Sequence, residues 1–99
     1  TYDMKDKQYT PNSCWIGLIP DNIESDDEYI NDQHDVSYFH VGDDRKGKGT
    51  LRTSKIGVYN IKCFADDGGG KLIAKLASKI YVSYIKTKDQ RTSFKANDT

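Results

Sequence analysis

Aromatic side chains and carboxylates are the residues of this chain whose types suggest a binding chemistry. The sequence of 99 residues contains seven Tyr, three Phe and one Trp, together with fifteen acidic side chains. An exposed ring can stack on the apolar face of a sugar, while neighbouring Asp or Asn side chains bind its hydroxyl groups. Five side chains are therefore candidates for contact with a ligand: Trp15, Tyr38, His40, Tyr81 and Tyr84.

Two turns carry an Asp-Asp pair each, which suggests calcium binding. Calcium takes about six to eight oxygen ligands. Strand counting places both turns at one end of the fold, with the acidic segment 21–35 at the other end. The candidate calcium ligands are Asp43, Asp44, Asp66 and Asp67. In the alternative interpretation these aspartates are ordinary turn formers, and the cations of Arg45, Lys46 and Lys48 compete for their carboxylates.

The two cysteines, Cys14 and Cys63, are too few to form a four-ligand zinc site by themselves. The two histidines, His34 and His40, do not have the spacing of a zinc finger. Two interpretations of the cysteines remain open. They are either buried free thiols or the two halves of a disulfide between strands.

Several functional classes lose support from the sequence. It contains no Gly-x-Ser-x-Gly elbow, no P-loop and no metalloprotease helix motif. Its net charge is zero, whereas a nucleic-acid binder normally shows a basic excess or a basic face. No apolar run approaches the roughly 18 residues that cross a bilayer. We therefore expect no enzymatic activity, no nucleic-acid partner, no membrane insertion and no cofactor other than calcium.

Strand-forming residues dominate the elements that must position these groups, and helical periodicity is weak. The expected strands are 14–19, 35–41, 50–53, 58–64, 71–77 and 80–85, with a bend near Ser78. Turn-forming residues fill 42–49 and 65–70. This spacing predicts an all-β antiparallel β-sandwich of about six to eight strands, in one domain over residues 1–85. The polar residues 86–99 form a tail or a weak edge strand, with Phe94 as an apolar anchor.

Alternation assigns the side chains of two expected strands to opposite faces of a sheet. In 58–64 one face carries Tyr59, Ile61 and Cys63, and the other carries Asn60 and Lys62. In 35–41 one face carries Val36, Tyr38 and His40, and the other carries Ser37, Phe39 and Val41. The segment 21–33 is either a loop or a short helical turn.

Four segments in a fixed order carry a family resemblance: CWIGLIP, GTL, GVYNIKCFADDGG and KLIAKLASKIYV. This order is similar to an immunoglobulin-like module with the pattern Asp-Trp-Ile-Gly-Leu-Tyr-Pro, Gly-Thr-Leu and Gly-x-Tyr-x-Phe-Arg-x-Phe-x-x-Asp-Gly. SKICH domains of eukaryotic adaptor proteins and repeat modules of bacterial surface proteins share that outline. The resemblance covers roughly residues 9–84. It implies an immunoglobulin-like sandwich in which Trp15 is a core or near-core residue, and it specifies no function.

Three departures from the family pattern stand out. Cys14 replaces the Asp of the pattern, and Ile19 replaces an aromatic residue. Only TYDM can represent the strand that precedes the Trp-Ile-Gly-Leu strand in the family. Either that strand is shortened, or the C-terminal tail fills its place, or an edge stays open to strand addition by a partner.

These observations favour a non-catalytic recognition module. The leading hypothesis is lectin- or adhesion-type binding of glycans or glycoproteins. The alternative is a SKICH-like intracellular adaptor that binds another protein through an open sheet edge. Two further hypotheses are a calcium-dependent binding module and a small hydrolase. The sequence does not determine the compartment, although its similarity to surface modules favours an extracellular or cell-surface location.

Overall fold

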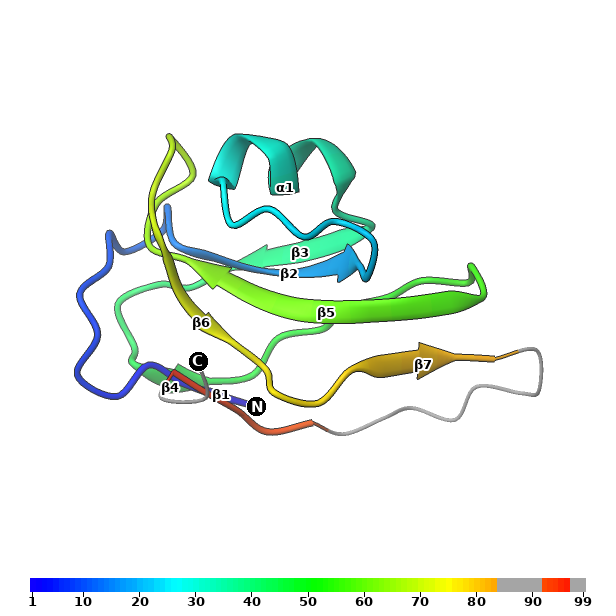
Figure 1. Ribbon diagram of the computed structural model, residues 1–99. Coiled ribbons are helices and arrows are strands. Elements are labelled where there is room, and N and C mark those ends of the chain that lie inside the picture. The colour runs from blue at the N-terminus through cyan, green and yellow to red at the C-terminus, as the bar shows by residue number, and fades with distance from the viewer. Residues whose placement is uncertain (84–91, 97–99) are drawn as a thin grey trace.

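The computed structural model describes residues 1–83 and 92–96 (Figure 1). The described residues form eight strands and one short helix. In chain order these are β1 (Tyr2–Asp3), β2 (Trp15–Pro20), α1 (Glu28–His34), β3 (Ser37–His40), β4 (Lys46–Gly47), β5 (Gly57–Phe64), β6 (Leu72–Lys75), β7 (Ile80–Val82) and β8 (Phe94–Lys95). The predicted all-β fold of six to eight strands is confirmed.

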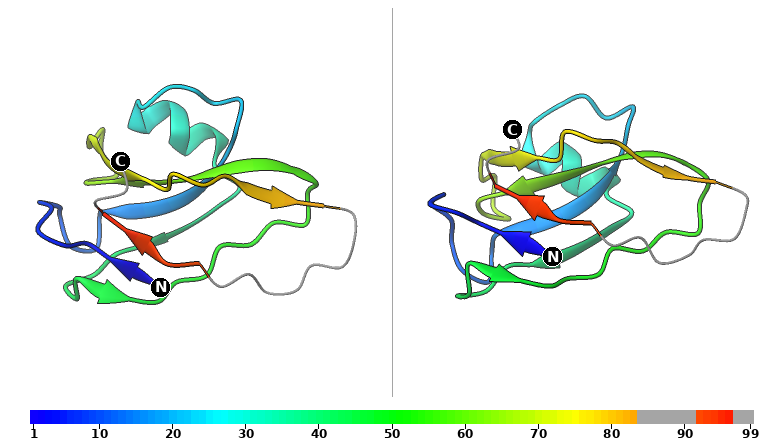
Figure 2. Two further views of the ribbon diagram at one scale, coloured as in Figure 1. Left: turned by 60° about the horizontal axis from the view of Figure 1, so that its bottom comes forward. Right: turned by 90° about the horizontal axis from the view of Figure 1, so that it is seen from below.

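The strands form two sheets. The first has the order β4-β1-β8, and Figure 2 shows β1 between its two neighbours. The second has the order β3-β2-β5-β6, and β7 also pairs with β5. The pairings are antiparallel except that of β1 with β8, which is parallel. The two sheets enclose a core, while α1 covers the opposite face of the larger sheet (Figure 1).

The main core lies between the two sheets and is apolar. From β2 it takes Ile16 and Leu18, and from β5 it takes Tyr59, Ile61 and Cys63. The predicted alternation of β5 is therefore confirmed, because Asn60 and Lys62 occupy its other face. Burial of this apolar surface is the main contribution to folding free energy.

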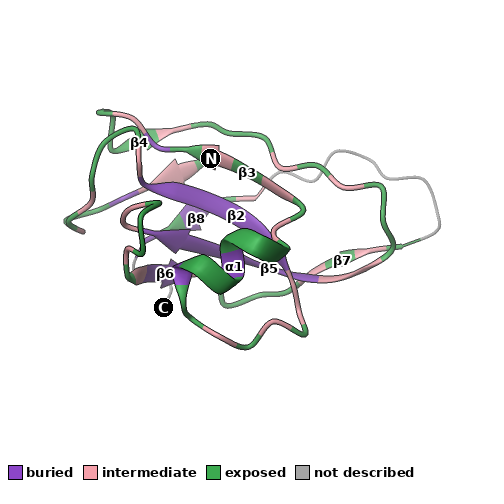
Figure 3. Cartoon of the chain, turned by 90° about the horizontal axis from the view of Figure 1, so that it is seen from above, coloured by how far each residue is buried: buried purple, intermediate pink, exposed green. Residues whose placement is uncertain are grey.

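A smaller core lies on the other face of the larger sheet. Its buried members are Trp15, Ile19 and Phe64, and the half-buried Ile23 and Leu72 pack against them. Because side chains are covered on both faces, residues 15–19 of β2 and most of β5 are buried (Figure 3). This explains the continuous apolar run in CWIGLI, since a strand that is covered on both faces needs no polar alternation.

The segment between β2 and β3 folds into a helix, which was the alternative expectation for residues 21–33. Asp27 caps α1 by accepting a hydrogen bond from the Tyr29 backbone N at 2.8 Å. The Tyr29 hydroxyl donates to Gly68 O at 3.1 Å, so the helix reaches the 65–70 turn. The expectation that the acidic segment and this turn lie at opposite ends is wrong. The helix folds back across the sheet, because the apolar groups beneath it need a cover.

The strand expected at 50–53 is also wrong, and a strand forms instead at Lys46–Gly47 inside a predicted turn. The reason is a partner that is distant in sequence. Tyr2 of β1 pairs with Gly47, and Asp3 pairs with Lys46. An added Cβ at Gly47 would lie 2.6 Å from the Tyr2 hydroxyl oxygen, so the glycine allows this close pairing.

The first sheet contains the N-terminal segment that we compared with the first strand of the family pattern. Only Tyr2–Asp3 forms a strand there, and the C-terminal strand β8 pairs with it. Phe94 is 3% exposed and belongs to the main core, as expected of an apolar anchor. The expected domain boundary at residue 85 lies outside the described residues.

Candidate functional site

A hollow of about 240 Å³ opens on the helix-covered face of the larger sheet, and we call it the aromatic hollow. It lies where β3, α1 and the 65–70 turn meet, and its lining residues are Trp15, Asp32, Tyr38, His40 and Asp67. The structure therefore brings together three of the five predicted ligand-contact residues. It adds one predicted calcium ligand, Asp67, and one residue that was not singled out, Asp32.

The register of β2 and β3 builds the aromatic side of this hollow. Trp15 pairs with His40, and Gly17 pairs with Tyr38. Residues two apart on a strand share a face, so Tyr38 and His40 stand side by side as predicted. An added Cβ at Gly17 would lie 2.4 Å from Cζ3 of Trp15, which shows that the indole lies over the glycine. The missing side chain makes room for the indole beneath Tyr38.

The aromatic rings form a connected group in which Tyr38 and His40 are exposed. The ring of Trp15 stacks on Phe64 at a centroid distance of 4.9 Å and meets Tyr38 edge-on at 6.3 Å. Tyr38 meets the His40 ring edge-on at 5.6 Å. Tyr38 is 54% exposed, whereas Trp15 is 2% exposed. Tyr38 is thus the larger of the two rings that a ligand can reach, and Trp15 has the packing role implied by the family resemblance.

A buried carboxylate fixes the indole. Trp15 Nε1 donates to Glu28 Oε2 at 2.9 Å, and the Gly69 backbone N donates to Glu28 Oε1 at 3.0 Å. Glu28 is 2% exposed and belongs to the first turn of α1. One side chain therefore connects the strand, the helix and the turn that enclose the hollow. Sequence reasoning missed this residue, since no local pattern links two side chains thirteen positions apart.

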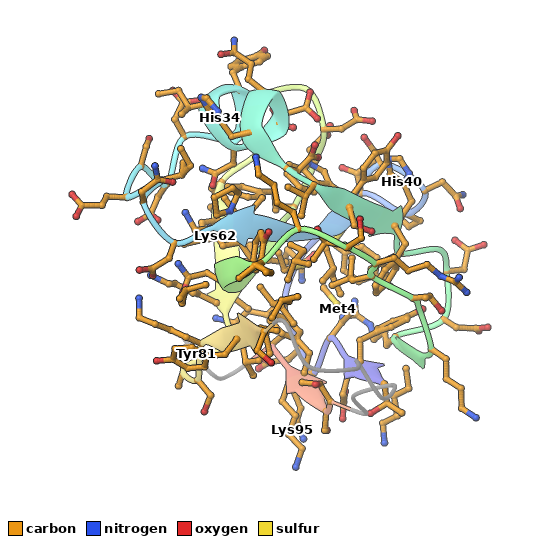
Figure 4. The ribbon with its side chains drawn as sticks, turned by 90° about the vertical axis from the view of Figure 1, so that its right-hand side faces the viewer. Met4, His34, His40, Lys62, Tyr81 and Lys95 are labelled. Carbon is orange, nitrogen blue, oxygen red and sulfur yellow. The ribbon has the colours of Figure 1, made fainter. Side chains whose placement is uncertain are left out.

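A buried ammonium group holds the helical segment against the sheet. Lys62 Nζ donates to Ile23 O at 3.1 Å, to Ser25 O at 2.9 Å and to Asn31 Oδ1 at 2.9 Å. Lys62 is fully buried on β5, and burial lowers its pKa (Figure 4). The alternation of β5 correctly predicted which face of the strand Lys62 occupies. Its burial was not predictable, because the cover comes from a segment about 30 residues earlier in the sequence.

The carboxylate side of the hollow comes from the 65–70 turn. Asp67 Oδ2 lies 3.5 Å from His40 Nε2, and the Asp67 side chain is 57% exposed. The Ser13 hydroxyl lies 2.8 Å from Asp67 Oδ1, which positions this carboxylate. Asp67 thus remains accessible to a ligand while its orientation is set by two neighbours.

The neighbouring Asp66 has a structural role in this turn. Its Oδ1 accepts a hydrogen bond from the Gly68 backbone N at 3.0 Å, and its Oδ2 accepts from the Thr10 hydroxyl at 3.1 Å. The Gly68 hydrogen bond, followed by those from Ser13 and Thr10, holds the pKa of Asp66 below its usual value. Asp66 is therefore an ionised turn organiser, and Asp67 is the member of the pair that lines the hollow.

The helix contributes further negative charge. Asp32 lines the hollow, and Asp35 follows α1 as its C-cap. Burial, followed by the charges of Asp32 and Glu28, raises the pKa of Asp35 to about 6. Within the described residues, Asp35 Oδ2 is buried without a hydrogen-bond partner. The charge on Asp35 is thus disfavoured in the folded state.

The side chains of Ser13, Asp67 and His40 do not have the arrangement of a catalytic triad. In a catalytic triad the imidazole contacts the nucleophile and the carboxylate contacts the imidazole. Here the Ser13 hydroxyl contacts Asp67, which in turn contacts His40. The carboxylate therefore lies between serine and histidine, which is the wrong order for activating the serine.

The other predicted contact residues do not join the hollow. Tyr81 is 64% exposed, but it pairs with Val58 on β5, whereas Phe64 pairs with Trp15. Six residues of strand separate these positions, roughly 20 Å at about 3.3 Å per residue. Figure 4 shows Tyr81 well apart from His40. Tyr84 lies outside the described residues.

The four aspartates of the calcium hypothesis are not assembled into a site. Across residues 1–83 and 92–96, no group of three or more His, Cys, Asp or Glu side chains is arranged to hold a metal ion. Asp66 binds Gly68, Ser13 and Thr10 through its carboxylate. Asp44 uses its backbone oxygen to accept from the Tyr2 hydroxyl at 3.4 Å.

The two cysteines lie next to each other in the main core. Cys14 and Cys63 are free thiols, fully buried, with their Sγ atoms 3.7 Å apart. The contact with Cys14, followed by burial, raises the pKa of Cys63 well above its usual value. A neutral thiol is unreactive as a nucleophile. The disulfide stays a prediction, which a mass measurement with and without reduction would test.

Comparison with protein-family models, with curated proteins and with solved structures finds no match to this chain. The resemblance to the immunoglobulin-like and SKICH-type modules therefore rests on the sequence motifs alone. Within the described part of the chain, no helix has the length and apolar character needed to cross a membrane.

Proposed function

We propose that this chain is a non-catalytic recognition module that binds a glycan at the aromatic hollow. One observation carries the proposal: the half-exposed ring of Tyr38 lies in one hollow with His40 and with the carboxylates of Asp32 and Asp67. A pyranose has an apolar face that stacks on such a ring and hydroxyl groups that bind such carboxylates. The volume of about 240 Å³ is below the roughly 300–1,000 Å³ of drug-sized pockets, which suits a single sugar ring.

The contacts beneath Tyr38 favour binding because they already restrict the motion of its ring. A ligand that contacts the ring therefore causes a smaller loss of side-chain entropy. The ring rests on the edge of the Trp15 indole, and the indole is held by Phe64 and Glu28. A side chain that is fixed before binding costs less to immobilise than a mobile one. By contrast, Tyr81 on β7 is more exposed, and none of the described aromatic rings stacks on it.

A glycan array tests this proposal directly, with Tyr38→Ala and Tyr81→Ala as a matched pair. Both substitutions remove an exposed tyrosine from a strand, but only the first removes the ring of the aromatic hollow. We expect the wild type and Tyr81→Ala to bind the same glycans, and Tyr38→Ala to lose at least tenfold in affinity. An array without signal, or equal binding by the two variants, would overturn the proposal.

A second candidate is protein recognition by strand addition, as in the SKICH-like adaptor hypothesis. The observation that favours it is the position of β3, which forms one edge of the larger sheet. An edge strand can accept a strand from a partner. Val41 N donates to Cys14 O, so by strand alternation the N–H of Phe39 faces β2 and that of His40 faces the open edge. A proline at His40 would remove this edge donor, so a protein partner would lose affinity for His40→Pro while a glycan array stays silent for the wild type.

A further inference from the structure

The aromatic hollow has an uneven charge. Its five lining residues include the two carboxylates of Asp32 and Asp67, no lysine and no arginine. Its one basic group is the His40 imidazole, which is already paired with Asp67 at 3.5 Å. Both aspartates are exposed at the surface, so a ligand can reach them. A ligand that enters the hollow therefore meets more negative than positive charge.

Glu28, on α1 beside the indole, adds a further carboxylate to this region. Asp35 adds little negative charge, because burial, followed by the charges of Asp32 and Glu28, disfavours its ionisation. On this face Lys62 is fully buried and bound to two carbonyls and the Asn31 amide oxygen. Its ammonium group is directed away from solvent and cannot contact a ligand.

The exposed ring of Tyr38 adds an attraction for cations. An ammonium group that lies over the face of a tyrosine ring is attracted by the π electrons. A charged amine in the hollow can therefore contact the ring while it donates charge-assisted hydrogen bonds to Asp67 or Asp32. A neutral sugar makes the same ring contact and can donate hydroxyl hydrogen bonds to the carboxylates, but it lacks the opposite charge of the ammonium group. An acidic sugar is repelled by both carboxylates.

The smaller sheet provides a contrast within the same molecule. A hollow of about 390 Å³ on that sheet is lined by Lys46, Lys48 and Lys95, with Asp3 as its carboxylate. The two hollows thus differ in charge, because lysines predominate in the lining of one and carboxylates in the lining of the other. An acidic glycan that binds this chain would meet favourable charge on the smaller sheet, where the Tyr38 substitution has no effect.

We propose that the aromatic hollow selects glycans with a positively charged amino group, that is, amino sugars without an N-acetyl group, over neutral and acidic sugars. This selectivity rests on the proposed glycan-binding function. It follows from three features of one hollow: an accessible aromatic ring, two accessible carboxylates and the absence of lysine and arginine from the lining. Acetylation removes the charge and two of the donors of the amine, so it removes the preferred contact.

Titration calorimetry with two matched probes tests the selectivity. The probes are a glucosamine trisaccharide and its fully N-acetylated counterpart, compared at low salt and a pH of about 6, where the amino groups of the first probe are protonated. We expect the amine to bind about tenfold more tightly, and we expect the preference to fall as salt is added. Equal binding, or tighter binding of the acetylated probe, would overturn the selectivity.

Three variants connect the preference to the hollow. Asp67→Asn and Asp32→Asn keep the shape of the side chain and remove its charge, so each should reduce the preference for the amine several-fold while affinity for the acetylated probe stays. Asp43→Asn changes an exposed aspartate outside the lining and should leave the preference unchanged. An unchanged preference in both hollow variants would place the amine elsewhere and contradict the proposal.

The outcomes separate this inference from the proposed function. If the glycan array detects Tyr38-dependent binding but the calorimetry finds no preference for the amine, the selectivity fails and the glycan-binding function stands. If neither probe binds and the array is silent, both fail. If the amine binds more tightly and Tyr38→Ala abolishes that binding, both are supported.

Discussion

The two faces of the larger sheet use the same strands for different purposes. Toward the smaller sheet, Ile16, Ile61 and Cys63 pack in an apolar core. Toward α1, the same strands present Trp15 and Lys62, which hydrogen-bond to groups of the covering segment. Both faces are buried, and the buried polar side chains of the described residues lie on the second face or in its cover: Glu28, Asn31, Asn60 and Lys62. The apolar face supplies stability, and the polar face supplies the geometry of the aromatic hollow.

This difference shows how a small chain can hold a binding surface in place. Apolar contacts are not directional, so they hold α1 against the sheet but do not set its position along the sheet. Hydrogen bonds to Glu28 and Lys62 are directional, and they determine where the helix and the 65–70 turn lie relative to Tyr38. Substitutions on each face should therefore have different consequences.

The apolar face should give the largest loss of stability. Ile16→Ala leaves a cavity in the main core, where Ile16 is 1% exposed, and we expect the free energy of unfolding to fall by about 3 kcal/mol. Urea denaturation measures this change. Ile56→Ala is the control, because Ile56 is 56% exposed and should change stability by less than about 0.5 kcal/mol. Similar losses at both positions would contradict the described core.

Lys62→Met should give the next largest effect. Methionine keeps most of the volume, but Asn31 Oδ1 and the carbonyls of Ile23 and Ser25 lose a charged donor. We expect a loss of about 2 kcal/mol and faster amide hydrogen exchange in α1. The exposed Lys71 provides the control Lys71→Met, which should leave exchange unchanged. Unaltered exchange in Lys62→Met would mean that Lys62 does not hold the helix.

Glu28→Gln should change both the stability of the fold and the environment of the Trp15 indole. The amide keeps one acceptor for Trp15 or Gly69 but loses the charge and the second acceptor, so we expect a loss of about 1.5 kcal/mol. Because the indole N–H changes its partner, the fluorescence maximum of Trp15 should shift as well. Glu24→Gln alters an exposed glutamate of the same segment, and its fluorescence should match that of the wild type.

Asp35→Asn should give the smallest effect, with the opposite sign. The pKa of Asp35 is raised to about 6 in the folded state, above its unfolded value of about 3.9. The folded state therefore binds more protons between these values, and its stability falls as pH rises from about 4 to above 6.

The asparagine cannot ionise, so the variant should be more stable than the wild type at pH 7, by about 1 kcal/mol after screening by solvent. At pH about 3 the two proteins should be equal, because the wild-type carboxyl is protonated in both states. Melting curves at both pH values measure this, with Asp43→Asn as the control. A stabilisation of equal size at both pH values would contradict the raised pKa.

The sequence allowed the sandwich and the faces of its main strands to be predicted, because alternation in 35–41 and 58–64 follows from strand geometry. It also identified Trp15, Tyr38 and His40 as candidates. It did not reveal Glu28, Lys62 or Asp32 as members of the site or its support. Their roles depend on α1 folding back over the sheet, which is a tertiary event without a local signal. Likewise, β4 forms only because β1 lies beside it.

The most direct test of glycan binding at the aromatic hollow is a nitrogen–proton chemical-shift map of the labelled protein with a bound oligosaccharide. We predict that the largest changes occur at the amides of Tyr38, His40 and Asp67 and at the indole N–H of Trp15. The amide of Tyr81 on β7 should shift little. Changes centred on β7 or on the smaller sheet, with the Trp15 indole unaffected, would contradict a binding site on the helix-covered face.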